Sequence, residues 1–202
     1  MAQQHTYPLT LQGELSNPPG NGLWLIKWLL AIPHFIILAF LWVGFAVAWV
    51  IALFAILFTG KYPRGLFDYN VGVLRWSWRV AFYSYNANGT DKYPPFTLES
   101  IDDYPADLQV VYPKKLSHGL VLIKWWLLAI PHLIIVSIFS GGREGTGLVP
   151  LLVIIACVIL LFTGKYNQNI FKIVMGMNRW IYRVATYVAL MTDEYPPFRI
   201  WD

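Results

Sequence analysis

The sequence predicts an all-α integral membrane protein with two tandem repeats, each a helical hairpin plus an amphipathic interfacial helix. Composition is the first observation that predicts it. Of the 202 residues, 57% are hydrophobic and 13% are charged, against about 45–50% and about 25% in soluble domains. The second observation is a set of motifs that occurs twice, and the third is the presence of long apolar segments in both halves. This composition excludes a disordered chain, and the single cysteine excludes a disulfide scaffold.

Aromatic content and charge placement both indicate lipid as the main solvent. Ten Trp, twelve Tyr and twelve Phe accompany a mean hydropathy of +0.50, and aromatic side chains accumulate at membrane interfaces. The net charge is +4, but Lys and Arg are scattered at the ends of apolar stretches. We therefore expect membrane lipids as partners and no nucleic acid. No Lys or Arg precedes Lys27, so we expect the first apolar stretch to be retained, not cleaved as a signal peptide.

Four sequence blocks occur in the same order in both halves of the chain. The first copies are K-W-L-L-A-I-P-H, F-T-G-K-Y, R-W-S-W-R-V and T-D-K-Y-P-P-F, which begin at Lys27, Phe58, Arg75 and Thr90. The second copies begin at Lys124, Phe162, Arg179 and Thr192, and one extra Trp is inserted in the first of them. Repeated blocks in register predict a shared fold. We expect a first membrane repeat at 1–98, a polar linker at 99–110 and a second membrane repeat at 111–202.

In the second half, a hairpin is predicted from two apolar segments around a polar turn. Leu120–Ser140 is long enough to cross a bilayer, which needs about 20 helical residues. The glycine-rich segment 141–147 comes next as the turn, and Leu148–Phe162 is the shorter second arm.

The first half has no such polar turn. Leu23–Phe58 is apolar almost throughout and is too long for one straight span. Alignment of the halves places the turn near Gly44, where nothing polar would hold it in water. Two crossings and a re-entrant hairpin both remain open for this half.

A third segment in each half is predicted to be an amphipathic helix, at Leu66–Tyr85 and at Ile170–Leu190. Its polar residues share one narrow stripe, which comprises Asp68, Gly72, Arg75 and Arg79 in the first copy and Lys172, Gly176, Arg179 and Arg183 in the second. Such helices suit the membrane interface. The four arginines are candidate contacts for anionic headgroups, with pairing to Asp68 as the alternative in the first copy.

The basic residues also predict an orientation. With two hairpins, both tips face one side and only Arg143 lies there, so the positive-inside rule places both termini in the cytoplasm. Between the halves, Tyr85–His118 contains the alternating segment Leu108–Tyr112, which is consistent with a short strand.

With these motifs in view, the chain resembles a bacterial membrane-protein family known as domain of unknown function 4389, in two copies. The second copy departs from the first at Asn167, which replaces Pro63, and at Lys172, which replaces Asp68. The resemblance implies a multi-pass protein of the bacterial inner membrane and brings no assigned activity or catalytic residues.

Four ionisable residues inside apolar segments are candidate functional groups: Lys27, His34, Lys124 and His132. The histidines, paired across the repeats, could form a proton or metal site; alternatively they satisfy local polar groups freed by the preceding prolines. The lysines are most simply headgroup-level anchors.

No catalytic constellation is evident, so we expect a non-enzymatic scaffold or accessory subunit of a membrane complex. The alternative is a small transporter or ligand-binding protein with a polar site between the repeats. No cofactor and no metal are expected. The expected partners are lipids and either another protein or a second copy of the chain.

Overall fold

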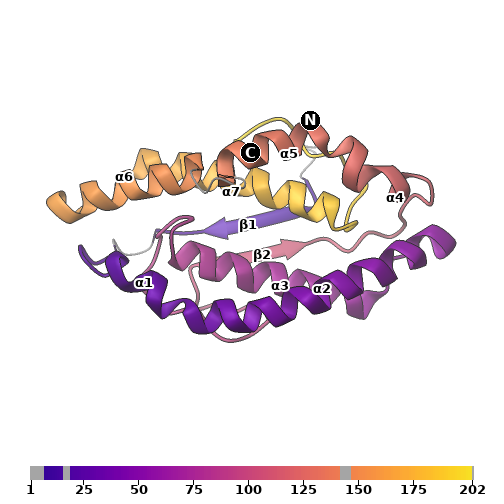
Figure 1. Ribbon diagram of the computed structural model, residues 1–202, viewed down its shortest axis with the longest axis horizontal. Helices are drawn as coiled ribbons and strands as arrows, with labels where there is room; N and C mark the ends of the chain where they lie inside the picture. Colours follow the sequence, from indigo (N-terminus) through magenta and orange to yellow (C-terminus); the bar gives the residue numbers. More distant parts are fainter. Residues whose placement is uncertain (1–6, 16–18, 142–146, 202) are drawn as a thin grey trace, which may run out of the picture.

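The computed structural model describes residues 7–15, 19–141 and 147–201, and helices dominate the fold (Figure 1). In chain order the elements are β1 (Leu9–Gly13), α1 (Trp24–Leu30), α2 (Ile32–Thr59), α3 (Arg64–Tyr83), β2 (Ala106–Val110), α4 (Leu120–Ile123), the π-helical turn η1 (Lys124–Leu128), α5 (Ile130–Ser140), α6 (Leu148–Thr163) and α7 (Gln168–Val188).

The expected hairpin in the first half is absent, because α2 is one continuous helix of 28 residues. A continuous helix satisfies its own backbone groups, which a turn without polar partners would not do. Gly44 instead receives a side chain: the Tyr69 hydroxyl packs against it and donates a hydrogen bond of 2.8 Å to the Leu41 carbonyl. The glycine therefore marks a close contact between α2 and α3.

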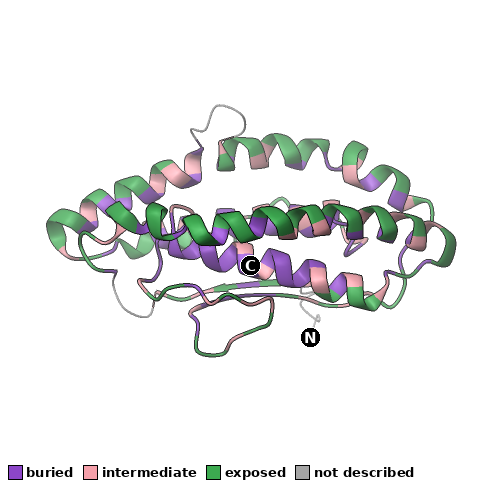
Figure 2. Cartoon of the chain, turned by 60° about the horizontal axis from the view of Figure 1, so that its bottom comes forward, coloured by how far each residue is buried: buried purple, intermediate pink, exposed green. Residues whose placement is uncertain are grey.

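In the second half, α5 and α6 lie end to end, so the hairpin prediction is wrong here as well (Figures 1 and 2). Gly147 lies directly against the backbone of Ser140 and Gly141, where a Cβ atom would clash. The helix therefore resumes where it stopped. Of the predicted polar turn, residues 142–146 lie outside the described residues.

The Trp inserted in the second copy is accommodated by η1. A π-helical turn holds one more residue than an α-helical turn, so an insertion can be absorbed without shifting the residues after it. As a result Lys124 and His132 occupy the same kind of buried position as Lys27 and His34.

By length and hydropathy, α2 could cross a membrane, and Leu120–Leu128 with Ile130–Ser140, bent by 44°, could form a second span. These are the candidates among the described residues. The remaining long apolar helix, α6, is shorter than the length needed.

The predicted amphipathic helices are confirmed as α3 and α7, each within a few residues of its expected ends. They form a middle layer. Helix α3 packs between α2 and β2, and α7 packs between α6 and β1. We call α1, α2, α5 and α6 the outer helices. Figure 2 shows them on one side of this layer and the sheet on the other.

The all-α prediction needs one correction, since β1 and β2 form a two-stranded antiparallel sheet, with Leu9 opposite Val110 and Gly13 opposite Ala106. Strand β2 lies in the linker, where a short strand was consistent with the alternation. Strand β1 was not predicted.

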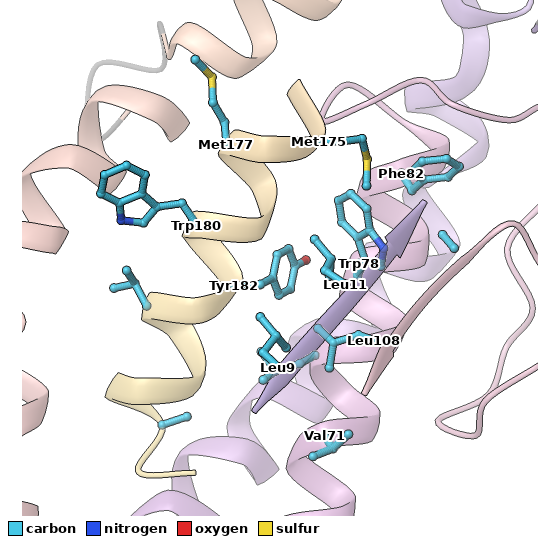
Figure 3. Close-up of a cluster of buried hydrophobic side chains, with 14 of the residues drawn as sticks. Leu9, Leu11, Val71, Trp78, Phe82, Leu108, Met175, Met177, Trp180 and Tyr182 are labelled. Carbon is cyan, nitrogen blue, oxygen red and sulfur yellow. The ribbon is translucent and has the colours of Figure 1, made fainter. Parts of the chain in front are cut away.

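The two repeats exchange their entry strands. Strand β1 precedes the helices of the first repeat but packs on α7 of the second, and β2 precedes the helices of the second but packs on α3 of the first. Figure 3 shows Leu9 and Leu108 between these helices, with Trp78 facing Tyr182. The two rings lie 5.5 Å apart in an edge-to-face arrangement. The repeats thus share one core, and neither half completes it alone.

Candidate functional site

Lys27 is buried and bound by the end of its own repeat. Its side chain is 1% exposed, and its Nζ atom donates to Asn88 Oδ1 at 2.6 Å and to the Thr90 carbonyl at 2.8 Å. The Asp91 carboxylate pairs with it at 2.7 Å. Helix α1 positions the lysine, and the segment after α3 supplies the acceptors, two of which belong to the T-D block.

Lys124 repeats this arrangement in the second half. Its Nζ atom donates to the Thr192 carbonyl at 2.9 Å and pairs with Asp193 Oδ1 at 2.7 Å. The Tyr187 ring lies nearby, at 5.8 Å from Nζ. Both buried lysines are therefore neutralised by an aspartate of the same repeat, and the expectation of anchors at headgroup level does not match this placement.

His34 and His132 occupy equivalent aromatic cages. The Trp76 indole N–H donates to His34 Nδ1 at 3.0 Å, and Trp180 donates to His132 Nδ1 at 3.0 Å. An accepting Nδ1 places the ring proton on Nε2, so both imidazoles are neutral. The Phe96 ring stacks on His34 with centroids 4.0 Å apart.

These histidines do not pair across the repeats as one of the two interpretations required. The ring contacts of His132 come from Tyr195 and Phe198, within its own repeat. Among the described residues, no group of three or more His, Cys, Asp or Glu side chains is placed to hold a metal ion. The histidines attach the Y-P-P-F segments to the helices.

Arg75 and Arg79 point toward the sheet layer and bind groups of the chain itself. Arg75 donates to the carbonyls of Leu108 and Leu98 at 2.8 and 2.9 Å and lies 3.1 Å from Asp107. Arg79 is fully buried and donates to the carbonyl of Glu99. Burial lowers the pKa of Arg79, and the Asp107 carboxylate opposes this shift. Asp68, the alternative partner, instead pairs with Arg64 at 2.9 Å.

The second-copy arginines also face inward. Arg183 is 3% exposed and donates to the Arg199 carbonyl at 3.2 Å. Burial is the main cause that lowers its pKa. Arg179 directs its Nε toward the carbonyl of Leu11 in β1. The segments that follow α3 and α7 are the tails of the two repeats. The four arginines expected to contact headgroups instead bind the strands and these tails.

The polar stripe of α3 and of α7 contains a glycine at the point where the tail of the repeat crosses the helix. A Cβ atom on Gly72 would lie 2.7 Å from Leu98 Cβ. Gly176 stands in the same relation to Ile200. The stripe predicted to meet the membrane interface is therefore a binding groove for the chain's own tails.

A family model for a domain of unknown function, DUF4389, matches residues 22–97 and 120–199. The chain belongs to this family. The two DUF4389 copies span the helices and tails of both repeats, which confirms the resemblance seen in the sequence. No curated protein and no solved structure matches the chain.

Three of the four recurring blocks, which begin at Lys27, Arg75 and Thr90 in the first copy, contact one another. Lys27 binds the T-D block and His34 binds the Y-P-P-F block, in both copies. Sequence reasoning missed Asp91, Asp193 and Asp107 as the partners of the buried cations. The repetition of T-D in both halves was the available signal for the first two.

A cavity of about 420 Å³ lies at the end of β1 and the start of α7. Two cations and one carboxylate line it: Lys172, Arg179 and Glu14. Trp201 from the second tail also contributes to its wall. Sequence reasoning placed Lys172 and Arg179 on one stripe but gave them no shared cavity.

Proposed function

We propose that this protein is a non-enzymatic integral membrane protein that acts as a scaffold or accessory subunit of a membrane complex. The observation that carries the proposal is the surface of the outer helices. Large apolar side chains lie exposed all along them, for example Phe40 at 75%, Phe58 at 76% and Phe162 at 82%. Monomeric soluble proteins rarely expose apolar surface on this scale.

The middle helices, α3 and α7, do not share this exposed apolar surface with the outer helices. No large hydrophobic side chain of α3 or α7 is among the exposed ones in the described chain. In contrast α2 contains no charged residue, and Lys27 and Lys124 in the neighbouring elements are buried. The outer surface is suited to hydrocarbon, since it presents apolar atoms without a charge to desolvate.

The absence of catalysis is proposed because the conspicuous polar groups serve the fold. Both lysines and Arg79 are engaged in ion pairs, and both histidines accept hydrogen bonds from tryptophans. A catalytic acid or base must instead reach a substrate.

The membrane we propose is the bacterial inner membrane, with both termini on its cytoplasmic side. The scattered basic residues outside the apolar helices support this side. The family resemblance supports the compartment.

The test is purification from native membranes. Membranes are first washed with carbonate, and the retained protein is extracted in mild detergent and analysed by mass spectrometry with everything that elutes with it. A stoichiometric protein partner in the retained fraction is the expected result. A protein released by carbonate would contradict the membrane proposal, and a lone chain with a bound small molecule would contradict the scaffold.

A second candidate, binding of a small anionic ligand, is favoured by the cavity at the end of β1 and the start of α7. Lys172 and Arg179 both line it, and such cations recognise phosphate or carboxylate groups. Stabilisation of the detergent-solubilised protein by phosphate or citrate, lost in Lys172→Gln, would support this function.

A further inference from the structure

We infer that the protein lies flat in the membrane, with its outer helices embedded along one leaflet and its sheet layer in water. This inference rests on the proposed membrane location and specifies the lipid surface as the partner of one face. In this orientation the protein enters the bilayer from one side and does not cross it.

The layer order is a first reason. The apolar outer helices lie on one side of α3 and α7, and the sheet lies on the other, as Figure 2 shows. One face of the molecule is thus apolar along its length. The opposite face carries the segment before β2, in which Asp102 and Asp103 are exposed.

The position of the sheet along the long axis is a second reason. Strands β1 and β2 lie near the middle of this axis, between the ends of the outer helices (Figure 1). Thr10 and Gln109 are exposed on these strands. If α2 crossed the bilayer, these polar side chains would lie near the hydrocarbon centre, where polar groups are costly.

The length of the outer helix is a third reason. Helix α2 has 28 residues, about 42 Å at roughly 1.5 Å per residue, and α1 extends the same path. The hydrocarbon core is only about 30 Å thick. A helix parallel to the surface has no such mismatch.

The similarity of the two ends is a fourth reason. Helix α2 ends at one end of the molecule and α6 at the other (Figure 1). Gly-Lys comes directly after both helices, so that Lys61 and Lys165 are exposed at opposite ends. A flat orientation places both lysines at the same headgroup level. A crossing would place them on opposite sides, against the bias of basic residues toward one side.

The test is labelling of single cysteines in sealed vesicles by a membrane-impermeant maleimide. The variants are Lys61→Cys, Lys165→Cys and Asp103→Cys, and the unmodified protein is the control because its own Cys157 is buried. Flotation first establishes that each variant is bound to the vesicles. Right-side-out and inside-out vesicles are then compared, before and after permeabilisation with detergent.

We expect all three cysteines to react in inside-out vesicles and all three to lose labelling in right-side-out vesicles. If Lys61→Cys and Lys165→Cys react in vesicles of opposite orientation, the protein crosses the bilayer and the flat orientation is overturned while membrane association stands. Failure to float would overturn both.

Discussion

The Nζ atom of Lys27 lies 2.7 Å from Oδ1 of Asp91, and the first helix of the repeat is thereby joined to the segment after its last helix. The lysine is 1% exposed, so the attraction acts in a poorly solvated environment. Lys124 and Asp193 form the same ion pair in the second repeat. The ion pairs close both repeats and give a first prediction.

Replacement of one partner should destabilise the fold because a buried ammonium loses its counter-charge. We expect Asp91→Asn to lower the free energy of unfolding by about 3 kcal/mol. The matched control is Asp103→Asn, which breaks an exposed pair and should cost at most about 1 kcal/mol. Thermal unfolding in detergent, followed by circular dichroism, measures both. Equal losses would contradict the structural role of the buried pair.

The hydrogen bond from Trp76 to His34 should appear as an energetic coupling. In a double-mutant cycle with His34→Ala and Trp76→Phe, we expect an interaction free energy of about 1 kcal/mol. The control cycle combines His34→Ala with Trp180→Phe, which belongs to the other cage. Additive effects are expected there, and an equally large coupling in both cycles would show that the histidines act together.

Gly72 should not tolerate a methyl group, although alanine usually stabilises helices. Gly72→Ala places a Cβ atom 2.7 Å from Leu98 Cβ. We therefore expect the free energy of unfolding to fall by about 1–3 kcal/mol and the tail that follows Thr97 to be cleaved faster by proteases. In Gly65→Ala, on the same helix, the new atom meets nothing within 4 Å. That control should be neutral or stabilised by up to about 1 kcal/mol. The same loss in both variants would argue against the tail contact.

The exchanged strands predict a specific cross-link. Thr10 and Gln109 are opposite residues in the antiparallel pair, so Thr10→Cys with Gln109→Cys should form a disulfide within one chain under mild oxidation. Non-reducing electrophoresis distinguishes this product from a linked dimer. If only dimers form, the strand pairing occurs between chains.

The helical content and the duplication were predictable because they depend on local patterns. The period of α3 and α7 reveals their amphipathic faces, and the repeated blocks reveal the shared fold. The sequence could not show which environment a polar stripe faces. The stripe that contains Arg75 meets carbonyl groups of the chain's own tail and β2 instead of lipid phosphates.

The two hairpin predictions were wrong for a different reason. The glycine-rich segment of the second half has the composition of a turn, yet α6 resumes against the end of α5. In the first half, Gly44 was interpreted as a break, whereas it accommodates Tyr69. Gly44 serves a contact between two helices, and Gly147 serves a contact between two helix ends. The composition of either segment does not reveal these contacts. The exchange of β1 and β2 is non-local.

Contact between the outer helices and lipid is the central claim, and quenching by brominated lipids tests it most directly. A fluorophore is attached at Phe40→Cys, on the exposed face of α2, and separately at Asp103→Cys on the sheet side. The account predicts strong quenching at residue 40 and little at residue 103. Weak and equal quenching at both positions would contradict it.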